Sequence, residues 1–249
     1  MPSKPYLANK WIPSPHNLIL SNSDIHLWRI VLPQSEEIKR NLFESLSNDE
    51  LSRLAKFYFN RDKDRFLISR GGLRNILARY LNIYPNQVDF QYKTLGKPYI
   101  NNKNLYFNVS HAANCIVYAV SNCSPIGIDI EYCEHDIDYL SITKNFFSNN
   151  EYTKLLTLHS DKRLLAFYRC WTRKEAYIKA IGKGLHFPLH QLEVSLLPDE
   201  EIQLLKIMDK TAEKDLWKLV EIFPQQDYIA SIATQQSFNN CLLWDWKIA

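Results

Sequence analysis

The stretch SNNEYTKL at residues 148–155 repeats the pattern of SNDELSRL at residues 47–54. Each copy has a serine followed three residues later by a glutamate, which is Glu151 in the later copy and Glu50 in the earlier one. In this capping-box pattern the two side chains satisfy free N–H groups at the start of a helix. Each stretch therefore predicts a helix N-terminus, and the pair suggests an internal repeat.

The segments that follow the two helix starts also correspond. Each start leads into a longer helix, expected at roughly residues 62–82 and 162–181. A strand-like segment comes next, NQVDF at residues 86–90 and HQLEV at residues 190–194. The order of elements is thus the same in both copies.

This order predicts an α+β fold built from two pseudo-symmetric halves. We place the boundary so that residues 1–123 form the first half and residues 124–249 form the second. An alternative stays open at this point, because SN-x-E is a common helix opener whose recurrence can arise by chance. The shared order of elements favours duplication.

The composition indicates a globular protein with a substantial core. The chain has 249 residues, 46% of them hydrophobic, and a formal net charge of +3. So small a charge is not typical of proteins that coat nucleic acids, although local basic clusters remain possible. The sequence shows no signal-peptide pattern and no run of about 18 apolar residues, so we expect no membrane span.

The cysteines indicate a reducing compartment. There are five, they are scattered, and no two form a CxxC pair. Neither a disulfide framework nor a zinc site is favoured by this arrangement. We therefore expect a cytoplasmic protein.

Two carboxylates alternate with isoleucines in the segment SPIGIDIEYCEHDID, residues 124–138. Period-two alternation predicts a strand with one buried face, on which Asp129 and Glu131 share the opposite face. Side chains two residues apart in a strand are separated by ~7 Å, from which both can reach one divalent cation. The alternative is an ordinary half-exposed strand with two solvated acids.

A third carboxylate occupies an unexpected place in the segment CWTRKEAYIKAIGKGL, residues 170–185. On a helical wheel, Glu175 lies between Trp171 and Ile178, within an apolar stripe. A buried carboxylate must be protonated, ion-paired or bound to a metal ion. A salt bridge to Lys179, four residues on, is the simplest alternative to a functional role.

Three oxygen ligands without cysteine or histidine favour Mg²⁺, with Mn²⁺ possible, over zinc. Water and a substrate phosphate would complete the coordination. A phosphate in turn requires cations nearby, and Lys179 and Lys183 flank the expected site. The segments GKPYI at 96–100 and FNVSHA at 107–112 add a Gly-Lys turn and the pair Ser110 and His111.

Several arginines precede these segments. Helix 62–82 carries Arg70, Arg74 and Arg79, and Arg53 and Lys56 belong to the preceding helix. Such a set is most often a solvated face, but arginines can also hold a phosphate in bidentate fashion.

Four segments in this order and spacing, GKPYI, FNVSHA, GIDIE and WTRKEAYIKAIGKGL, resemble the 4′-phosphopantetheinyl transferases of the surfactin-synthetase-activating (Sfp) type. The resemblance covers most of residues 40–197, and its last two segments are the most specific. It implies a monomer with two pseudo-symmetric α+β halves. It also implies an enzyme of the holo-acyl-carrier-protein synthase type, which uses Mg²⁺ to move phosphopantetheine from coenzyme A to a serine of a carrier protein.

The resemblance also implies roles for single residues. Asp129, Glu131 and Glu175 would bind Mg²⁺, with Glu175 a candidate general base, and Lys179 would hold the pyrophosphate. Ser110 and His111 would contact phosphates of coenzyme A. Lys97 and Pro98 would line its adenine side, and Arg53 would bind its 3′-phosphate.

The chain departs from the family's pattern at two other positions, Glu50 and Phe66. Where relatives often have a second lysine, three residues before Arg53, this chain has Glu50, and Phe66 replaces a small polar residue. Arg70 or Arg74 could take over the contact with the 3′-phosphate.

Two rival functions and several carriers remain open from the sequence. Another Mg²⁺-dependent nucleotide-processing enzyme, such as a nucleotidyl transferase, would use the same carboxylates, but the chain has no GxxxxGK[ST] phosphate loop. An RNA-binding module would use the arginine helix, yet it would give Glu175 no role, and we expect no nucleic-acid partner.

The acceptor could be an acyl, polyketide or peptidyl carrier protein. Because carriers of this system typically present an acidic helix, we expect a basic or apolar docking surface close to the metal site. Lys174, Lys183 and Lys144 are the basic candidates, and the alternative is that they are ordinary solvated lysines.

Overall fold

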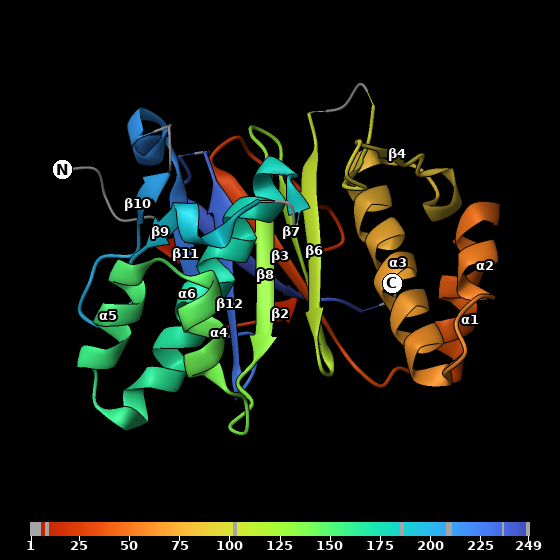
Figure 1. Ribbon diagram of the computed structural model, residues 1–249. Helices are drawn as coiled ribbons and strands as arrows, with labels where there is room; N and C mark the ends of the chain where they lie inside the picture. Colours follow the sequence, from red (N-terminus) through yellow and green to blue (C-terminus); the bar gives the residue numbers. More distant parts are fainter. Residues whose placement is uncertain are drawn as a thin grey trace.

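The computed structural model describes residues 6–7, 10–101, 104–184, 187–207, 211–235 and 237–247. Leu185, the last residue of the segment quoted above, lies outside these described residues. Strands and helices alternate in blocks along the chain (Figure 1).

The first half contains three helices between strands. Its elements are β1 (Tyr6–Leu7), β2 (Ile12–Pro13), β3 (Asp24–Val31), α1 (Glu36–Glu44), α2 (Asn48–Leu54), α3 (Asn60–Leu81), the short 3₁₀ helix η1 (Pro85–Gln87), β4 (Gln91–Tyr92), β5 (Pro98–Tyr99), β6 (Tyr106–Ala112) and β7 (Cys115–Ser121).

The second half repeats the order that starts at β3, with a further 3₁₀ helix, η4, and a last strand, β13, added. Its elements are β8 (Ile126–Tyr132), α4 (Tyr139–Phe146), α5 (Asn149–Thr157), α6 (Ser160–Ile181), η3 (Leu189–Gln191), β9 (Leu192–Val194), β10 (Leu204–Ile207), η4 (Thr211–Leu216), β11 (Lys218–Ile222), β12 (Tyr228–Thr234) and β13 (Asn240–Asp245).

The strand pairing of the two halves also corresponds. The order β3-β7-β6 in one sheet matches the order β8-β12-β11 in the other, and all four pairings are antiparallel. Each half adds a two-stranded hairpin, β4-β5 after η1 or β9-β10 after η3. The expected strand at residues 86–90 was wrong, because these residues form η1 and the link to β4, whereas residues 192–194 of the other segment do form β9. The expected α+β fold is confirmed, and its elements recur in two equivalent sets.

The two helix starts that suggested the repeat are present. Ser47 precedes α2 and Ser148 precedes α5, and the backbone N–H groups of these serines donate to Glu50 and Glu151. The long helices end in the left-handed conformation, α3 at Asn82 and α6 at Gly182. That conformation stops the helix, and glycine adopts it without steric cost.

The two sheets lie side by side between the two groups of helices. In Figure 1, β8 and β6 stand next to each other, with α1, α2 and α3 on one side and α4, α5 and α6 on the other. The backbone N–H of Ile128 in β8 donates to Asn108 Oδ1 in β6 at 2.8 Å. Strands from both halves therefore meet at β6 and β8, where the site lies.

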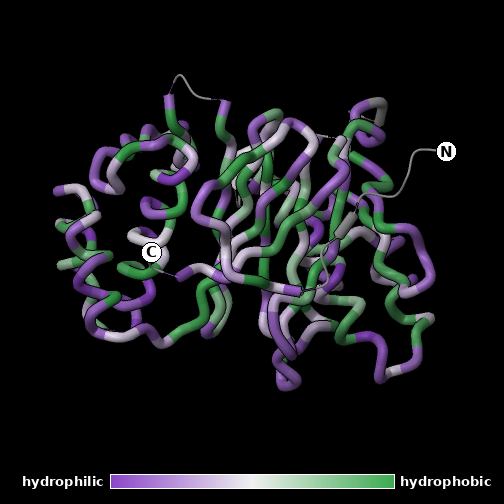
Figure 2. Tube along the Cα trace, turned by 180° about the vertical axis from the view of Figure 1, so that it is seen from behind, coloured by the Kyte–Doolittle hydropathy of each residue, from purple (hydrophilic) through white to green (hydrophobic). Residues whose placement is uncertain are grey.

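The apolar core holds the two halves together. One buried cluster combines residues of β3 and β7, such as Leu27 and Val117, with residues of β8 and β12, such as Ile128 and Ile232. Two further clusters pack α3 against the first sheet and α6 against the second. Figure 2 shows hydrophobic residues along the central strands and many hydrophilic residues in the outer loops.

The last strand of the second half pairs within the sheet of the first half. Strand β13 runs parallel to β3 on one side and to β1 and β2 on the other. The Arg29 guanidinium binds Asp245 at 2.6 Å across the β3-β13 pair. The division between residues 123 and 124 stays a prediction, and β13 shows that the halves are interlocked.

The described part of the chain has no helix that is both long and apolar enough to cross a bilayer. All five cysteines lie in that part, and all are free thiols.

Candidate active site

A cleft of about 480 Å³ opens where the two halves meet. It lies between α2, α3 and β6 on one side and β8 and α6 on the other. Eight of the residues that the sequence analysis selected line it, namely Arg53, Arg70, Ser110, His111, Asp129, Glu131, Glu175 and Lys179.

Strand β8 supplies two carboxylates to the cleft. Its isoleucines are buried in the core, and Asp129 is itself only 4% exposed. Asp129 Oδ1 accepts hydrogen bonds from Lys179 Nζ at 2.5 Å and from Ser110 Oγ at 3.1 Å. Asp129 Oδ2 is buried and has no hydrogen-bond partner. One side of this carboxylate is therefore satisfied, while the other has an unused acceptor.

The carboxylates of the cleft outnumber the ammonium group beside them. Burial raises the pKa of Glu131 to about 7, and the negative charge of Asp129 adds to this rise. Burial, followed by the charge of Asp129, also raises the pKa of Glu175. Lys179 lowers both pKa values but is a smaller influence. The site thus has a surplus of negative charge, which favours the binding of a further cation.

Lys179 joins the two halves rather than forming the salt bridge considered for its own helix. Its ammonium pairs with Asp129 of β8 and donates to Ser110 Oγ of β6 at 2.8 Å. Glu175, one turn earlier on α6, also lies in the cleft but is not the carboxylate that Lys179 binds. The carboxylate of Glu175 is consequently left for other partners.

Gly127 explains how α6 comes so close to β8. A Cβ atom at this position would lie 2.0 Å from the Ala176 carbonyl oxygen and 2.4 Å from the Ala180 nitrogen. Only glycine permits this approach of helix to strand. The contact brings Glu175 and Lys179 opposite Asp129 and Glu131.

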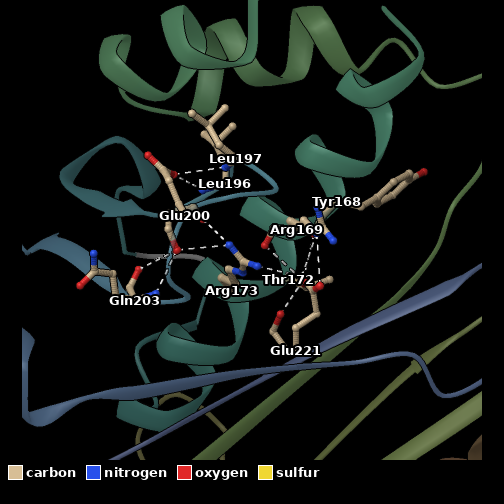
Figure 3. A network of polar contacts seen from close by, with 11 residues as sticks. Tyr168, Arg169, Thr172, Arg173, Leu196, Leu197, Glu200, Gln203 and Glu221 are labelled. Carbon is tan, nitrogen blue, oxygen red and sulfur yellow. Dashed lines mark hydrogen bonds and ion pairs between the residues drawn. The ribbon is translucent and has the colours of Figure 1, made fainter. Parts of the chain in front are cut away.

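Two residues just before Glu175, Thr172 and Arg173, fix α6 in place, and the sequence analysis missed their role. Thr172 Oγ1 shares a 2.8 Å hydrogen bond with Ser231 of β12, the strand partner of Asp129. Arg173 donates to the Ser195 carbonyl and pairs with Glu221 of β11 at 2.8 Å. Figure 3 shows Arg173 between Glu221 and the loop that carries Glu200 and Gln203.

The expectation that Lys174 is exposed for docking was wrong. Lys174 is fully buried and pairs with Glu151 at 2.6 Å. Its ammonium also donates to the carbonyl groups of Leu189 and Leu192. Lys183 and Lys144 are exposed, as expected. The signal was in the sequence, because Lys174 lies on the same helix face as the buried Ile178.

The placement of Arg74 corrects its assignment to the cleft. Arg74 is 3% exposed and pairs with Glu50 at 2.6 Å, while donating to the carbonyl groups of Val88 and Pro85. This arrangement is the counterpart of Lys174 and Glu151 in the other half. Arg74 therefore ties α3 to α2 and η1, and its predicted contact with coenzyme A has no support from this geometry.

Two other arginines of the first half form a basic end of the cleft. Arg53 lies over the ring of Phe66, which takes the place of the family's small polar residue, with 5.2 Å to its centroid. Arg70 lies over the ring of Phe90 and is held by Glu50 Oε1 at 3.4 Å. The unexpected Glu50 thus orients Arg70 instead of contacting a phosphate itself.

Arg79 does not extend this basic end. It donates to Ser14 Oγ at 2.7 Å and lies over the ring of Trp28. With Arg74 buried and Arg70 and Arg79 held by other groups, these three arginines do not form the exposed basic face that an RNA-binding module would use.

His111 stands at the rim of the cleft, with Ser110 beside it on β6. The buried part of its ring lowers the pKa of His111, and the positive charge of Arg65 lowers it further. Lys97 and Pro98 do not line the cleft. Lys97 instead donates to backbone carbonyl groups of α6 and β8, which corrects the expected orientation of its side chain toward a ligand.

The donor chemistry of the cleft fits Mg²⁺. Asp129, Glu131 and Glu175 offer only oxygen ligands, and Asp129 Oδ2 is a buried acceptor without a partner. Among the described residues, no group of three His, Cys, Asp or Glu side chains is arranged closely enough to hold a metal ion. Binding would therefore require these side chains to move together.

Comparisons with known proteins show the family of the chain. Residues 125–233 match the model of the 4′-phosphopantetheinyl transferase superfamily, and residues 28–123 match the model of the 4′-phosphopantetheinyl transferase N-terminal region. The chain is 40% identical over 231 residues to the 4′-phosphopantetheinyl transferase HetI of Nostoc sp., which covers 91% of this chain and 94% of that protein.

Two further relatives cover smaller shares. The 4′-phosphopantetheinyl transferase Sfp of Bacillus subtilis is 32% identical over 69% of this chain and 76% of its own length. The L-aminoadipate-semialdehyde dehydrogenase-phosphopantetheinyl transferase of Rattus norvegicus is 30% identical over 77% of this chain and 68% of its own length. The chain is thus an enzyme of the transferase class. It belongs to the 4′-phosphopantetheinyl transferase superfamily.

Proposed function

We propose that this enzyme transfers the 4′-phosphopantetheine group of coenzyme A to a serine of an apo carrier protein, an acyl, polyketide or peptidyl carrier. The products are the holo carrier and adenosine 3′,5′-bisphosphate. One observation carries the proposal: a single cleft joins an acidic end, at Asp129, Glu131 and Glu175, to a basic end, at Arg53 and Arg70. Coenzyme A has a pyrophosphate, which a metal ion at the acidic end could hold, and a separate 3′-phosphate, which the arginines at the basic end could hold.

The reaction forms one bond and breaks one. The serine oxygen bonds to the β-phosphorus of coenzyme A, while the bond from that phosphorus to the bridging oxygen breaks, and the bridging oxygen leaves with the nucleotide. Glu175 is the candidate that accepts the serine proton, since Lys179 occupies Asp129 and leaves Glu175 without an ion pair to it. Lys179 stabilises the negative charge that develops on the pyrophosphate oxygens.

The residues that would hold Mg²⁺, or Mn²⁺ in its place, are Asp129, Glu131 and Glu175. When bound, the ion supplies positive charge that offsets the charge of the pyrophosphate. The unpartnered Asp129 Oδ2 and the surplus of carboxylates support this assignment.

Residues on β6 and in the first half would bind the rest of coenzyme A. Ser110 and His111 line the cleft beside Lys179. His111 can donate a ring N–H to a phosphate oxygen, whereas Ser110, whose hydroxyl donates to Asp129, would have to turn to do so. Arg70 is the better placed of the two candidate arginines for the 3′-phosphate, because it lines the cleft together with Arg53 whereas Arg74 does not. We propose that the enzyme acts as a monomer, and its free thiols support a reducing, cytoplasmic setting.

The test is to incubate the enzyme with coenzyme A, Mg²⁺ and a panel of apo carriers, and to measure by mass spectrometry the gain of one phosphopantetheine group. A carrier whose acceptor serine is changed to alanine serves as the control. We expect transfer to at least one carrier, and loss of transfer when EDTA removes the metal. Failure to modify acyl, polyketide and peptidyl carriers alike would refute the proposal.

A further inference from the structure

Lys97 reaches from the first half of the molecule into the second. It lies in the turn between β4 and β5, in which Gly96 has a φ of +84° and donates to the Lys93 carbonyl at 2.8 Å. The aliphatic part of its side chain packs beside Gly182, at the end of α6. The ammonium group is therefore directed at the C-terminal end of the helix that carries Glu175 and Lys179.

Three backbone carbonyl groups surround this ammonium. Lys97 Nζ donates to Ala180 O at 2.9 Å, to Lys179 O at 2.5 Å and to Ile126 O at 3.2 Å. The first two belong to the last turn of α6, whose carbonyl groups have no partner within the helix. The third lies at the start of β8. A cation at a helix C-terminus is also favoured by the helix dipole.

The environment of Lys97 is costly for a charged group. Burial lowers the pKa of Lys97 to about 8, and the positive charge of Lys93 contributes to this decrease. The carbonyl dipoles of two different elements are what hold the ammonium in place. An exposed lysine would make no such set of contacts, so the position of the Lys97 side chain is specific.

The contacts of Lys97 and those of Lys179 meet at one residue. Lys97 binds the backbone carbonyl of Lys179, while the side chain of Lys179 binds Asp129 and Ser110. Lys97 also binds Ile126, three residues before Asp129 on β8. It therefore contacts both elements whose relative position sets the Lys179–Asp129 contact.

We propose that Lys97 is a positioning residue, which clamps the last turn of α6 to the start of β8 so that Lys179 reaches its place in the cleft. The proposed effect of Lys97 on turnover rests on the proposed transfer reaction. The clamp between α6 and β8 does not depend on which reaction the enzyme performs. The β4-β5 hairpin of the first half thus acts on the site through the backbone, without contact with the substrate.

The clamp is tested first by hydrogen exchange, which requires no activity. Lys97→Met keeps a straight side chain, one atom shorter, and removes its charge and its hydrogen-bond donors. Lys93→Met is the matched control in the same hairpin. We expect the amides of residues 178–183 to exchange about tenfold faster in Lys97→Met and to be unchanged in Lys93→Met. Unchanged exchange in Lys97→Met would overturn the clamp, even if the enzyme transferred nothing to any carrier.

The effect on turnover is tested in two backgrounds. Lys97→Met should lower kcat about tenfold or more, with KM for coenzyme A changed less than about threefold. In a Lys179→Ala background, where the residue it positions is already gone, Lys97→Met should lower kcat further by less than about threefold. This coupling distinguishes positioning of Lys179 from a general loss of stability.

Other outcomes contradict the proposal in separate ways. A raised KM for coenzyme A with normal kcat would mean that Lys97 contacts the nucleotide. Equal decreases of kcat in both backgrounds would mean that Lys97 does not act through Lys179. Faster amide exchange in Lys97→Met with normal kcat would mean that Lys97 stabilises the fold but does not position Lys179 for turnover.

Discussion

Gly127 of β8 lies directly against the backbone of Ala176 in α6, so that a methyl group on Gly127 would stand 2.0 Å from the Ala176 carbonyl oxygen. Ala176 follows Glu175, and Gly127 precedes Asp129 by two residues. The contact between these two backbones therefore sets the distance between carboxylates that belong to different elements.

Gly127→Ala should disrupt this spacing. The added methyl group must push α6 away from β8, and overpacking of this severity costs about 3 kcal/mol or more. We expect a lower melting temperature together with loss of phosphopantetheine transfer, measured by thermal denaturation and mass spectrometry. Wild-type values for both would show that helix and strand have room that the structure does not indicate.

Glu175→Gln should separate chemistry from packing. The volume is retained and the carboxylate is lost, so transfer should fall by a factor of order 10² or more while stability stays within about 0.5 kcal/mol. Glu221→Gln is the control on the opposite side of α6. It weakens the ion pairs with Arg169 and Arg173, so it should reduce stability more than it reduces kcat. The reverse pattern in the two variants would contradict the assignment.

Lys174→Met should act on stability and not on carrier docking. It leaves Glu151 buried without its ion partner, which costs about 3 to 5 kcal/mol. Because so large a loss can unfold the chain, the double change Lys174→Met, Glu151→Gln is the companion variant and should recover part of the stability. Urea denaturation measures both, and an unaltered unfolding midpoint in the single variant would rule out the buried pair as a stabilising contact.

Docking of the carrier should depend on the two candidate lysines that are exposed. Lys144→Glu combined with Lys183→Glu should raise KM for an acidic carrier at low salt, and added salt should reproduce the effect in the wild type. KM for coenzyme A serves as the internal control. A carrier KM that responds neither to salt nor to charge reversal would mean that docking is mainly apolar.

Stability should depend on pH through His26. This side chain is 1% exposed, and burial lowers the pKa of His26 to about 4. The Tyr80 hydroxyl accepts a hydrogen bond from Trp28 Nε1 and shares a second hydrogen bond, of 2.8 Å, with His26 Nδ1. The unfolded chain binds a proton near pH 6.5 while the folded chain does not, so this contribution is complete above pH 6.5 and is lost as the pH falls toward 4.

The magnitude of the His26 effect is about 3 kcal/mol over this range, since each unit of pKa difference corresponds to about 1.4 kcal/mol. His26→Asn retains a hydrogen-bonding group for Tyr80 but does not titrate, so its free energy of unfolding should fall less than that of the wild type between pH 6.5 and 4. Urea denaturation at several pH values gives both curves. Parallel curves would show that His26 is not responsible.

The sequence was sufficient for the parts of the site that depend on local periodicity. Alternation in β8 predicted that Asp129 and Glu131 share a face, and the helical wheel predicted that Glu175 lies off the solvent side. Both features are present in the cleft. The capping boxes likewise predicted two helix starts, because the side chains that satisfy a helix end lie within three residues of it.

What could not be predicted depends on partners far apart in the sequence. Nothing local indicates that Lys174 meets Glu151, that Arg74 meets Glu50, or that Lys97 turns toward α6. The helix period can show that a side chain such as Lys174 faces the core, but only the tertiary fold decides which distant group it meets. The sequence also does not show which sheet β13 joins, because its partner β3 lies more than 200 residues earlier in the chain.

Because of strand β13, the first sheet can be completed only after the end of the chain has been synthesised. It lies inside the sheet of the first half, between β3 and the short strands β1 and β2, although its residues 240–245 are translated long after the rest of that sheet. On the ribosome, β3 must wait with one edge open until residue 245 has emerged. An unpaired strand edge is a template for pairing with other chains, so the nascent first half carries an aggregation hazard that the complete chain removes when β13 pairs with β3.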